Sequence, residues 1–298
     1  MKTKSKDISI DTLRSYSSAF SRTVFSEIIE FGDFTHIDWL LQYEDNTNLF
    51  NTYFDYFIYL YSWLKKKYRC EYFFKNEIIN QYIIKKLGTK DSIVFNEFRV
   101  GESVVDLAIM NGESKAFEIK TNFDSPKRLI KQLNDYCRLF NKVYIVISQD
   151  NISQYLDIIP DSIGILTLDV YRKQVKINTY RDALLQRCVD PKMVMKCLRA
   201  TEYIQIVQEF YESLSFKKED DLYDKCLIAI EKIPSSVLNA LFIKTIKKRK
   251  SITGLLDNIP LEFRQMCLSL NLTGRRTEKL FNQLNNPINR KPSCICRI

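Results

Sequence analysis

The sequence predicts an α/β fold in which helices pack against a mixed β-sheet. From residue 68 onward the elements follow the order helix, strand, strand, strand, helix, strand, and helical regions lie on both sides of this run. That order is typical of an α/β sandwich and not of a doubly wound nucleotide-binding fold. With 7 glycines, the chain also lacks the glycine-rich phosphate loops of the common nucleotide-binding motifs.

Three regions follow from the residue pattern. The 298 residues are 45% hydrophobic, which is enough to bury a sizeable core. Residues 1–67 are expected to be a helical N-terminal region, because apolar residues recur there at helical spacing. Residues 68–180 are expected to form the α/β core. Residues 181–298, in which Pro191 opens a helix, are expected to be a helical, basic C-terminal region.

The elements of the core can be placed in order. A helix over residues 68–87 is expected to end at Gly88, where a left-handed conformation suits glycine. Ser125 as N-cap and Pro126 at the first helical position open a second helix, which runs to about Phe140. The expected strands are residues 92–100, 103–110, 116–121 and 143–148, followed by a closing hairpin of residues 163–170 and 174–180.

Cellular setting is predicted from apolar runs and cysteines. The longest apolar run, residues 53–64, is about half a membrane span and contains Asp55, so we expect a buried aromatic helix and no membrane partner. No apolar secretory segment follows Met1. The 8 cysteines form no Cys-x-x-Cys pair and fit a reducing cytoplasm. Cys294 and Cys296 remain an alternative metal-binding pair.

The single histidine limits the chemistry. HNH, HD and metallo-β-lactamase nucleases need several histidines around a metal, and this chain has only His36, which we expect at the surface or half-buried. A hydrolytic metal site here must therefore use carboxylates. Carboxylate oxygens favour Mg²⁺ or Mn²⁺.

Positive charge is concentrated near the C-terminus. From Leu241 to the end there are 12 Lys and Arg residues against 3 Asp and Glu, whereas 33 of each precede that point. A polyanion-binding region is expected, with nucleic acid, DNA above all, favoured over an anionic membrane; a solvated basic surface without a partner is the alternative. The candidate phosphate contacts there are Lys247, Lys248, Arg249 and Lys250.

A Glu-x-Lys triplet, Glu118-Ile119-Lys120, stands out by its context. A second triplet, Glu113-Ser114-Lys115, shows that the pattern alone is common in this chain. The first triplet lies in an expected strand, where a period of two places Glu118 and Lys120 on one face. A structural salt bridge across a hairpin is the competing interpretation.

Asp106 strengthens the case, because it interrupts the apolar strand at residues 103–110. A three-residue loop at positions 111–113 would place Asp106 directly opposite Glu118, whereas a two-residue loop would send the two side chains to opposite faces. Two neighbouring carboxylates repel each other unless a cation lies between them. A divalent ion is the simplest such cation.

The roles of these residues follow from their chemistry. Asp106 and Glu118 are expected to hold Mg²⁺, with the Ile119 backbone carbonyl as a further candidate ligand. The ion would polarise a phosphate oxygen and lower the pKa of a water molecule. Lys120 would orient or help deprotonate the attacking water and offset negative charge in the transition state.

This arrangement resembles the PD-(D/E)xK nuclease superfamily, whose motif is an acidic residue on one strand and Glu/Asp-x-Lys on the next. The resemblance covers residues 68–148, or 68–180 with the hairpin, and implies a restriction-endonuclease-like α-β-β-β-α-β core. One departure is that Val105 stands where the proline of the name would be. The helical flanks match no pattern that we identify.

Further site residues are implied by the resemblance. Gln132 and Tyr136 are similar to the Gln-x-x-x-Tyr element of RecB-like members and share one helix face. Glu77 matches a glutamate on the first core helix that contributes a metal ligand or a water contact in some members, with Glu71 as a substitute. Glu97 on the first strand is a second candidate, with a salt bridge to a basic neighbour as the alternative. At the start of the helix after the triplet, Lys127 and Arg128 are candidates for phosphate contacts, with a solvated helix face as the alternative.

The sequence therefore predicts a Mg²⁺-dependent nuclease that hydrolyses phosphodiester bonds of DNA in defence or DNA processing. The alternatives are an RNase or toxin-like effector, a non-catalytic nucleic-acid-binding module, and an interaction protein whose helices bind a partner subunit. Cleavage of both strands would favour a homodimer, because one site per chain cuts one strand at a time.

Overall fold

A computed structural model describes residues 8–45, 47–121, 124, 126–171, 174–212 and 221–289. The chain forms two compact units. The helical unit extends to Phe73 and includes the residues from Leu270 onward, and the core unit is Phe74–Ser269. The division of the chain into three regions at residues 67 and 180, which follows from the sequence pattern, stays a prediction. Ser125, Cys294 and Cys296 lie outside the described residues.

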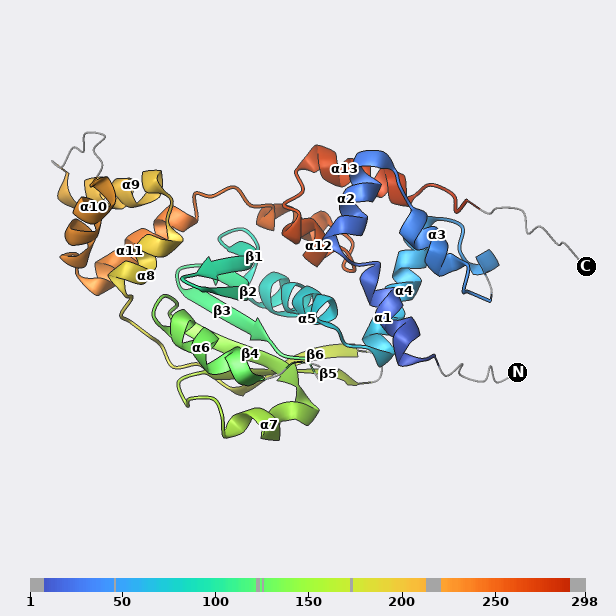
Figure 1. The fold of residues 1–298 in the computed structure, drawn as a ribbon, viewed down its shortest axis with the longest axis horizontal. Helices are drawn as coiled ribbons and strands as arrows, with labels where there is room; N and C mark the ends of the chain where they lie inside the picture. Colours follow the sequence, from blue (N-terminus) through green and yellow to red (C-terminus); the bar gives the residue numbers. More distant parts are fainter. Residues whose placement is uncertain are drawn as a thin grey trace, which may run out of the picture. The chain divides into compact units, whose positions relative to one another are not determined.

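The described part of the helical unit consists of helices and their connections (Figure 1). Its longest helix, α4, begins with a capping box: the Thr52 hydroxyl accepts from the Asp55 amide, and the Asp55 carboxylate accepts from the Thr52 amide. This explains the aspartate inside the apolar run. The elements are α1 (Ile10–Ser18), α2 (Arg22–Phe31), α3 (Thr35–Leu41), η1 (Thr47–Leu49), α4 (Tyr53–Lys67) and α13 (Gly274–Leu284).

The core unit is built on a six-stranded mixed sheet in the order β1-β2-β3-β4-β5-β6. The first three strands are antiparallel, β3, β4 and β5 run parallel, and β6 closes the sheet as an antiparallel hairpin. The α/β class, the mixed sheet and the closing hairpin are confirmed. The strands are β1 (Ile93–Val100), β2 (Ser103–Met110), β3 (Ser114–Ile119), β4 (Lys142–Ser148), β5 (Gly164–Tyr171) and β6 (Gln174–Arg181).

The first core helix differs from its prediction. Helix α5 (Glu71–Glu77) begins three residues later than expected and continues as a π-helix, η2 (Ile78–Leu87). The Gly88 amide closes the last wide turn on the Ile83 carbonyl at 2.8 Å. Gly88 has a φ of 78° and a ψ of 155°. The positive φ favours glycine, as expected, but the ψ shows that the residue is not in the left-handed helical conformation.

Helices cover both faces of the sheet. Ala116 shares one hydrophobic cluster with Leu133 of α6 (Leu129–Cys137), whereas the next residue, Phe117, packs against Tyr82 of η2 with ring centroids 5.3 Å apart. Because successive strand residues point to opposite faces, α6 and η2 lie on opposite sides of β3. The short elements η3 (Pro126–Arg128), η4 (Gln149–Asn151) and α7 (Ile152–Leu156) flank this layer.

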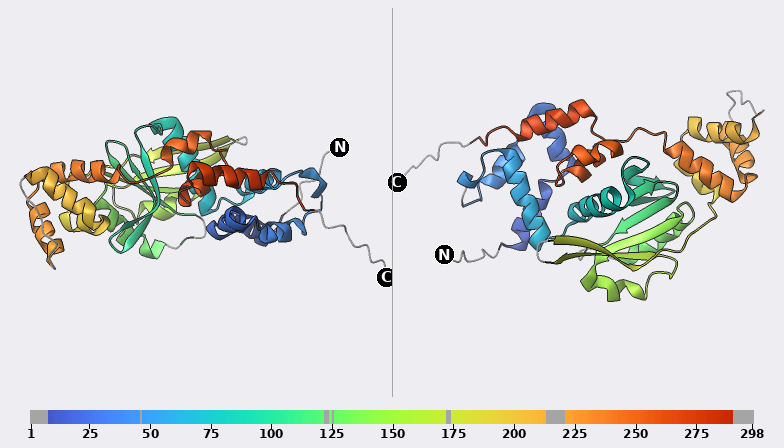
Figure 2. Two further views of the ribbon diagram at one scale, coloured as in Figure 1. Left: turned by 90° about the horizontal axis from the view of Figure 1, so that it is seen from above. Right: turned by 180° about the vertical axis from the view of Figure 1, so that it is seen from behind.

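The later helices of the core unit extend the same cluster. Buried residues of the helices that follow the sheet belong to the same cluster as residues of β1, β2 and α6. In both views these helices lie at one end of the sheet (Figure 2). They are α8 (Pro191–Cys197), α9 (Ala200–Tyr211), α10 (Leu222–Glu231) and α11 (Ser235–Ile246), followed by η5 (Thr253–Asn258) and α12 (Arg264–Ser269) beside β1. In the described part of the chain, no helix is long and apolar enough to cross a membrane.

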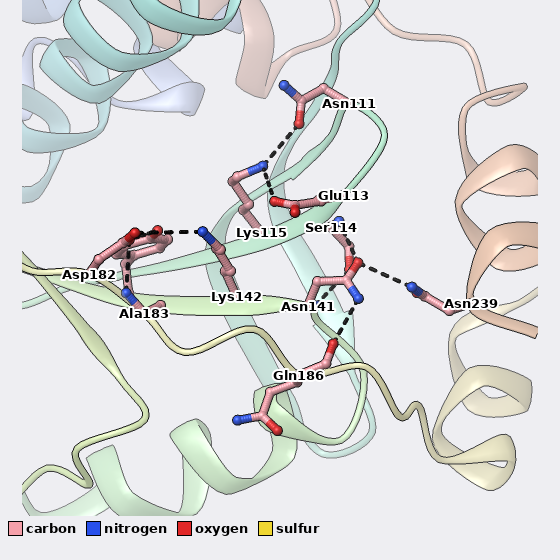
Figure 3. Close-up of polar contacts among 11 residues, drawn as sticks. Asn111, Glu113, Ser114, Lys115, Asn141, Lys142, Asp182, Ala183, Gln186 and Asn239 are labelled. Atoms are coloured by element: carbon pink, nitrogen blue, oxygen red, sulfur yellow. Dashed lines mark hydrogen bonds and ion pairs between the residues drawn. The ribbon is translucent and has the colours of Figure 1, made fainter. Parts of the chain in front are cut away.

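Asn141 anchors the beginning of β3, which sets the position of the strand that carries the triplet (Figure 3). Its side-chain oxygen accepts from the Ser114 amide at 2.9 Å, and its own backbone amide donates to the Ser114 hydroxyl at 2.9 Å. Its side-chain nitrogen donates to the Gln186 carbonyl. The Asn239 side chain of α11 donates to the side-chain oxygen of Asn141. The Asn141 side chain therefore joins β3 to the chain that leads into α8 and to α11.

Candidate functional site

The hairpin between β2 and β3 has the three-residue loop on which the site hypothesis depends. Met110 pairs with Ser114 and Leu107 with Phe117, and the loop is closed by a hydrogen bond from the Asn111 amide to the Glu113 carbonyl at 3.0 Å. One further step in this register places Asp106 opposite Glu118. The register expected from a three-residue loop is confirmed.

Asp106 accepts two contacts from different parts of the core. Its Oδ2 accepts a hydrogen bond from the Ile119 backbone amide at 2.7 Å, which fixes the carboxylate beside the Glu-x-Lys triplet. Its Oδ1 lies 3.2 Å from Nζ of Lys75, a residue of α5 that is only 2% exposed. The carboxylate inside an apolar strand is thus paired with a buried ammonium group.

Glu118 and Lys120 form a buried pair with support from α6. Nζ of Lys120 donates to Oε1 of Glu118 at 2.7 Å and to Oε1 of Gln132 at 3.3 Å. The Tyr136 hydroxyl lies 2.8 Å from Oε2 of Glu118 and 2.8 Å from the Val104 carbonyl. Gln132 and Tyr136, one helical turn apart, therefore reach the two ends of the Glu118–Lys120 pair.

Two carboxylates act on the pKa of the Tyr136 hydroxyl. Burial raises the pKa of the Tyr136 hydroxyl, and the charge of Glu118, its hydrogen bond and the charge of Asp106 raise it further. Both carboxylates therefore act on the same hydroxyl, which stays protonated and serves as a hydrogen-bond donor.

The second triplet provides a comparison within the same hairpin. Nζ of Lys115 lies 3.1 Å from Oε2 of Glu113 and donates to Oδ1 of Asn111 at 3.2 Å, all at the hairpin loop (Figure 3). This is a local ion pair beside a turn. The Glu118–Lys120 pair differs because two residues of α6 bond to it and Asp106 accepts from the Ile119 amide between the two.

Glu97 lies at the position of β1 that faces Asp106. Asn96 pairs with Leu107 and Phe98 with Val105, so the register between them joins Glu97 to Asp106. Oε1 of Glu97 is 3.9 Å from Nζ of Lys75, and its side chain is 47% exposed. Glu97 also has a φ of 57°, an uncommon conformation for a residue other than glycine.

The role of Glu77 as a metal ligand stays a prediction. Glu77 is 3% exposed and accepts a hydrogen bond from Gln81 at 3.3 Å. Lys75, two residues before Glu77 in α5, is the residue that contacts Asp106. Lys75 is the site residue that sequence reasoning missed. Its signal was a lysine at helical spacing from the apolar Tyr72 and Ile79.

The donor set suits a divalent cation without requiring one. Asp106, Glu118 and the Ile119 carbonyl would supply the oxygen ligands that Mg²⁺ prefers. Among the described residues, no group of three or more His, Cys, Asp or Glu side chains could hold a metal ion. Lys75 and Lys120 already balance the two carboxylates. The divalent ion expected as the simplest such cation stays a prediction, because Lys75 and Lys120 also place positive charge beside the two carboxylates.

The candidate phosphate contacts fall into two groups. Arg128, at the end of η3, and the lysines Lys247, Lys248 and Lys250 are exposed. Arg249 is not: its guanidinium donates to both carboxylate oxygens of Glu202 at 2.7 and 2.6 Å and to the Cys197 carbonyl at 2.8 Å. Nε and Nη2 of Arg249 are therefore engaged within the core unit, and its contact with nucleic acid stays a prediction.

Comparison with known proteins places the chain in a family. The family model described as Bacteriophage P4 protein cII matches residues 64–261. The chain belongs to the Bacteriophage P4 protein cII family. The match contains the whole candidate site, from Lys75 to Tyr136, and the basic run to Lys250.

One curated relative and one solved structure resemble this member of the cII family. Protein cII of Enterobacteria phage P4 is 26% identical over 177 residues, which are 58% of this chain and 66% of that protein, just under two thirds of its length. A protein of unknown function, SPO1766 from Silicibacter pomeroyi, is 16% identical with a TM-score of 0.31 and covers 49% of this chain and 94% of its own. That score is too low to support an argument about fold or function.

Proposed function

We propose that the chain is a metal-dependent nuclease that hydrolyses phosphodiester bonds of DNA. The observation that carries the proposal is the hairpin register, which brings Asp106 opposite Glu118 with Lys120 beside it. Support from Gln132 and Tyr136 on the next helix favours a restriction-endonuclease-like core and membership of the PD-(D/E)xK superfamily. Neither the family name nor the relative specifies an activity, so the proposal rests on geometry.

Each residue of the site has a role in the proposed reaction. Asp106, Glu118 and the Ile119 carbonyl would hold Mg²⁺ or Mn²⁺, and the bound ion would supply polarisation of a phosphate oxygen and a more acidic water molecule. Lys120 places a positive charge where negative charge builds up on the phosphate. Gln132 positions the Lys120 ammonium, and Tyr136 holds the second oxygen of Glu118.

The test is cleavage by the full chain of supercoiled plasmid, linear DNA and single-stranded RNA, with Mg²⁺, Mn²⁺ or EDTA. Asp106→Asn, Glu118→Gln and Lys120→Met are each expected to lower the rate about 100-fold or more. Lys115→Met, taken from the second triplet, is the matched control and should retain activity. Full activity in any of the three site variants would overturn the assignment, and cleavage of RNA alone would favour the RNase alternative.

A non-catalytic nucleic-acid-binding module is the second candidate. The observation that favours it is the pairing of each carboxylate with its own lysine, Asp106 with Lys75 and Glu118 with Lys120. Such a network is charge-balanced without a metal ion. Retained, salt-sensitive binding of DNA with no cleavage of any substrate would support this candidate.

A further inference from the structure

Lys75 occupies an unusual place in the candidate site. Its side chain is 3% exposed, and its ammonium lies 3.2 Å from Asp106 and 3.9 Å from Glu97. An ammonium group this deeply buried needs carboxylate partners to offset its lost hydration. The Asp106 carboxylate is thus already paired with a positive charge, the Lys75 ammonium.

Divalent-ion binding at Asp106 conflicts with this arrangement. A divalent ion on that carboxylate would stand within a few ångströms of the Lys75 ammonium, and like charges at such a distance repel strongly in a poorly solvated site. The ion and the Lys75 ammonium therefore compete for Asp106. Glu97 is a second carboxylate with which the ammonium can pair, because it lies 3.9 Å away and its side chain is half-exposed to water.

The backbone of Glu97 provides an independent observation. Its φ of 57° is costly for a residue with a Cβ, and such conformations persist only where the surroundings hold them. The conformation occurs at the register position of β1 that faces Asp106. The strained residue and the buried ammonium therefore meet at one point of the sheet.

We propose that Lys75 gates the cation site: its ammonium holds Asp106 until a divalent ion displaces it toward Glu97. The inference rests on the proposed function, since it concerns the same carboxylates. Lys75 acts through Asp106 and is a positioning residue rather than a catalytic one. Glu97, expected from sequence as a metal ligand, becomes the acceptor for the displaced lysine.

The test measures Mn²⁺ binding to the full chain by calorimetry and by the paramagnetic resonance signal of free Mn²⁺. Lys75→Met is expected to tighten Mn²⁺ binding on the order of tenfold, because the competing cation is gone. Asp106→Asn should abolish binding. Lys131→Met, which breaks the exposed pair with Glu102, is the matched control and should change nothing.

A double-mutant cycle separates the two roles of Glu97. Glu97→Gln is expected to weaken Mn²⁺ binding several-fold in the wild-type background and to have no effect beside Lys75→Met. Equal weakening in both backgrounds would make Glu97 a ligand and overturn its role as acceptor. If Lys75→Met fails to fold, the same Mn²⁺ titration is made with Lys75→Arg. The guanidinium can pair with Asp106 and Glu97 at once, so this variant should bind Mn²⁺ more weakly than wild type. Unchanged or tighter binding in that variant would overturn the gate.

The remaining outcomes distinguish this inference from the proposed function. Wild-type Mn²⁺ binding with an unchanged affinity in Lys75→Met would overturn the gate and leave the nuclease proposal standing. Absence of Mn²⁺ binding in both proteins would overturn the metal site of the proposed function and the gate with it.

Discussion

At the scale of single residues, Tyr136 links the strand that carries Asp106 to the strand that carries Glu118. Its ring is fully buried, and its hydroxyl lies within hydrogen-bond distance of the Val104 carbonyl and the Glu118 carboxylate. Tyr155 is buried to the same extent, but in the described part of the chain its hydroxyl has no hydrogen-bond partner. The two tyrosines differ in what their hydroxyl groups contribute.

Tyr136→Phe is expected to lower the free energy of unfolding by about 1–3 kcal/mol, because buried acceptors lose their donor. Tyr155→Phe, the matched control, is expected to change it by less than about 0.5 kcal/mol, since it removes a hydroxyl that is already unpaired. Urea unfolding of the two variants checks this. Equal losses would show that the Tyr136 hydroxyl bonds contribute little to stability.

At the scale of elements, Arg249 ties the chain after α11 to the beginning of α9. Its guanidinium pairs with Glu202 and lies over the Phe98 ring, 5.8 Å from the centroid. Burial alone would raise the pKa of the Glu202 carboxyl, but hydrogen bonds from Arg249 and the Arg199 amide outweigh it and hold that pKa below its ordinary value. The ionised form of Glu202 is therefore favoured in the folded protein.

Arg249→Met is expected to cost about 2 kcal/mol of unfolding free energy at neutral pH. A carboxyl whose pKa is lowered on folding stabilises above its unfolded pKa, and that contribution is lost as the pH falls through its folded pKa. The difference between wild type and variant should thus shrink below about pH 4.5, the ordinary value for glutamate. Denaturant midpoints across this range measure it. Lys225→Met, from the exposed pair with Asp221, should show a small difference at every pH.

At the scale of the whole molecule, the excess positive charge is less available than the sequence suggests. The net charge is +9, and the basic residues cluster after Leu241. Arg249 is used internally, and in the helical unit Arg276 pairs with Glu30 at 2.7 Å. Lys247, Lys248 and Lys250 are left as the exposed part of the basic run.

Replacing Lys247, Lys248 and Lys250 together by Ala is expected to flatten the dependence of log K on log salt for DNA binding. Each lysine that contacts a phosphate should lower the slope by about 0.9. The matched control replaces Lys65, Lys66 and Lys67 at the end of α4, which removes the same charge from the helical unit. Equal slopes in both triple variants would show that the basic run makes no specific phosphate contact.

Sequence by itself determined the elements of the core and one half of the candidate site. Apolar periodicity and turn residues are local signals, so the six strands lie close to their expected positions. A three-residue loop and a period of two were enough to pair Asp106 with Glu118, because both residues belong to one hairpin.

Only the tertiary structure decided which residues approach that hairpin from elsewhere. The rotation of α5 brings Lys75 to Asp106, and packing between α9 and the end of α11 turns Arg249 inward. Helix α13 likewise joins the N-terminal helices in one unit. These contacts join segments far apart in the chain, and their geometry depends on how whole faces pack, which no local spacing records.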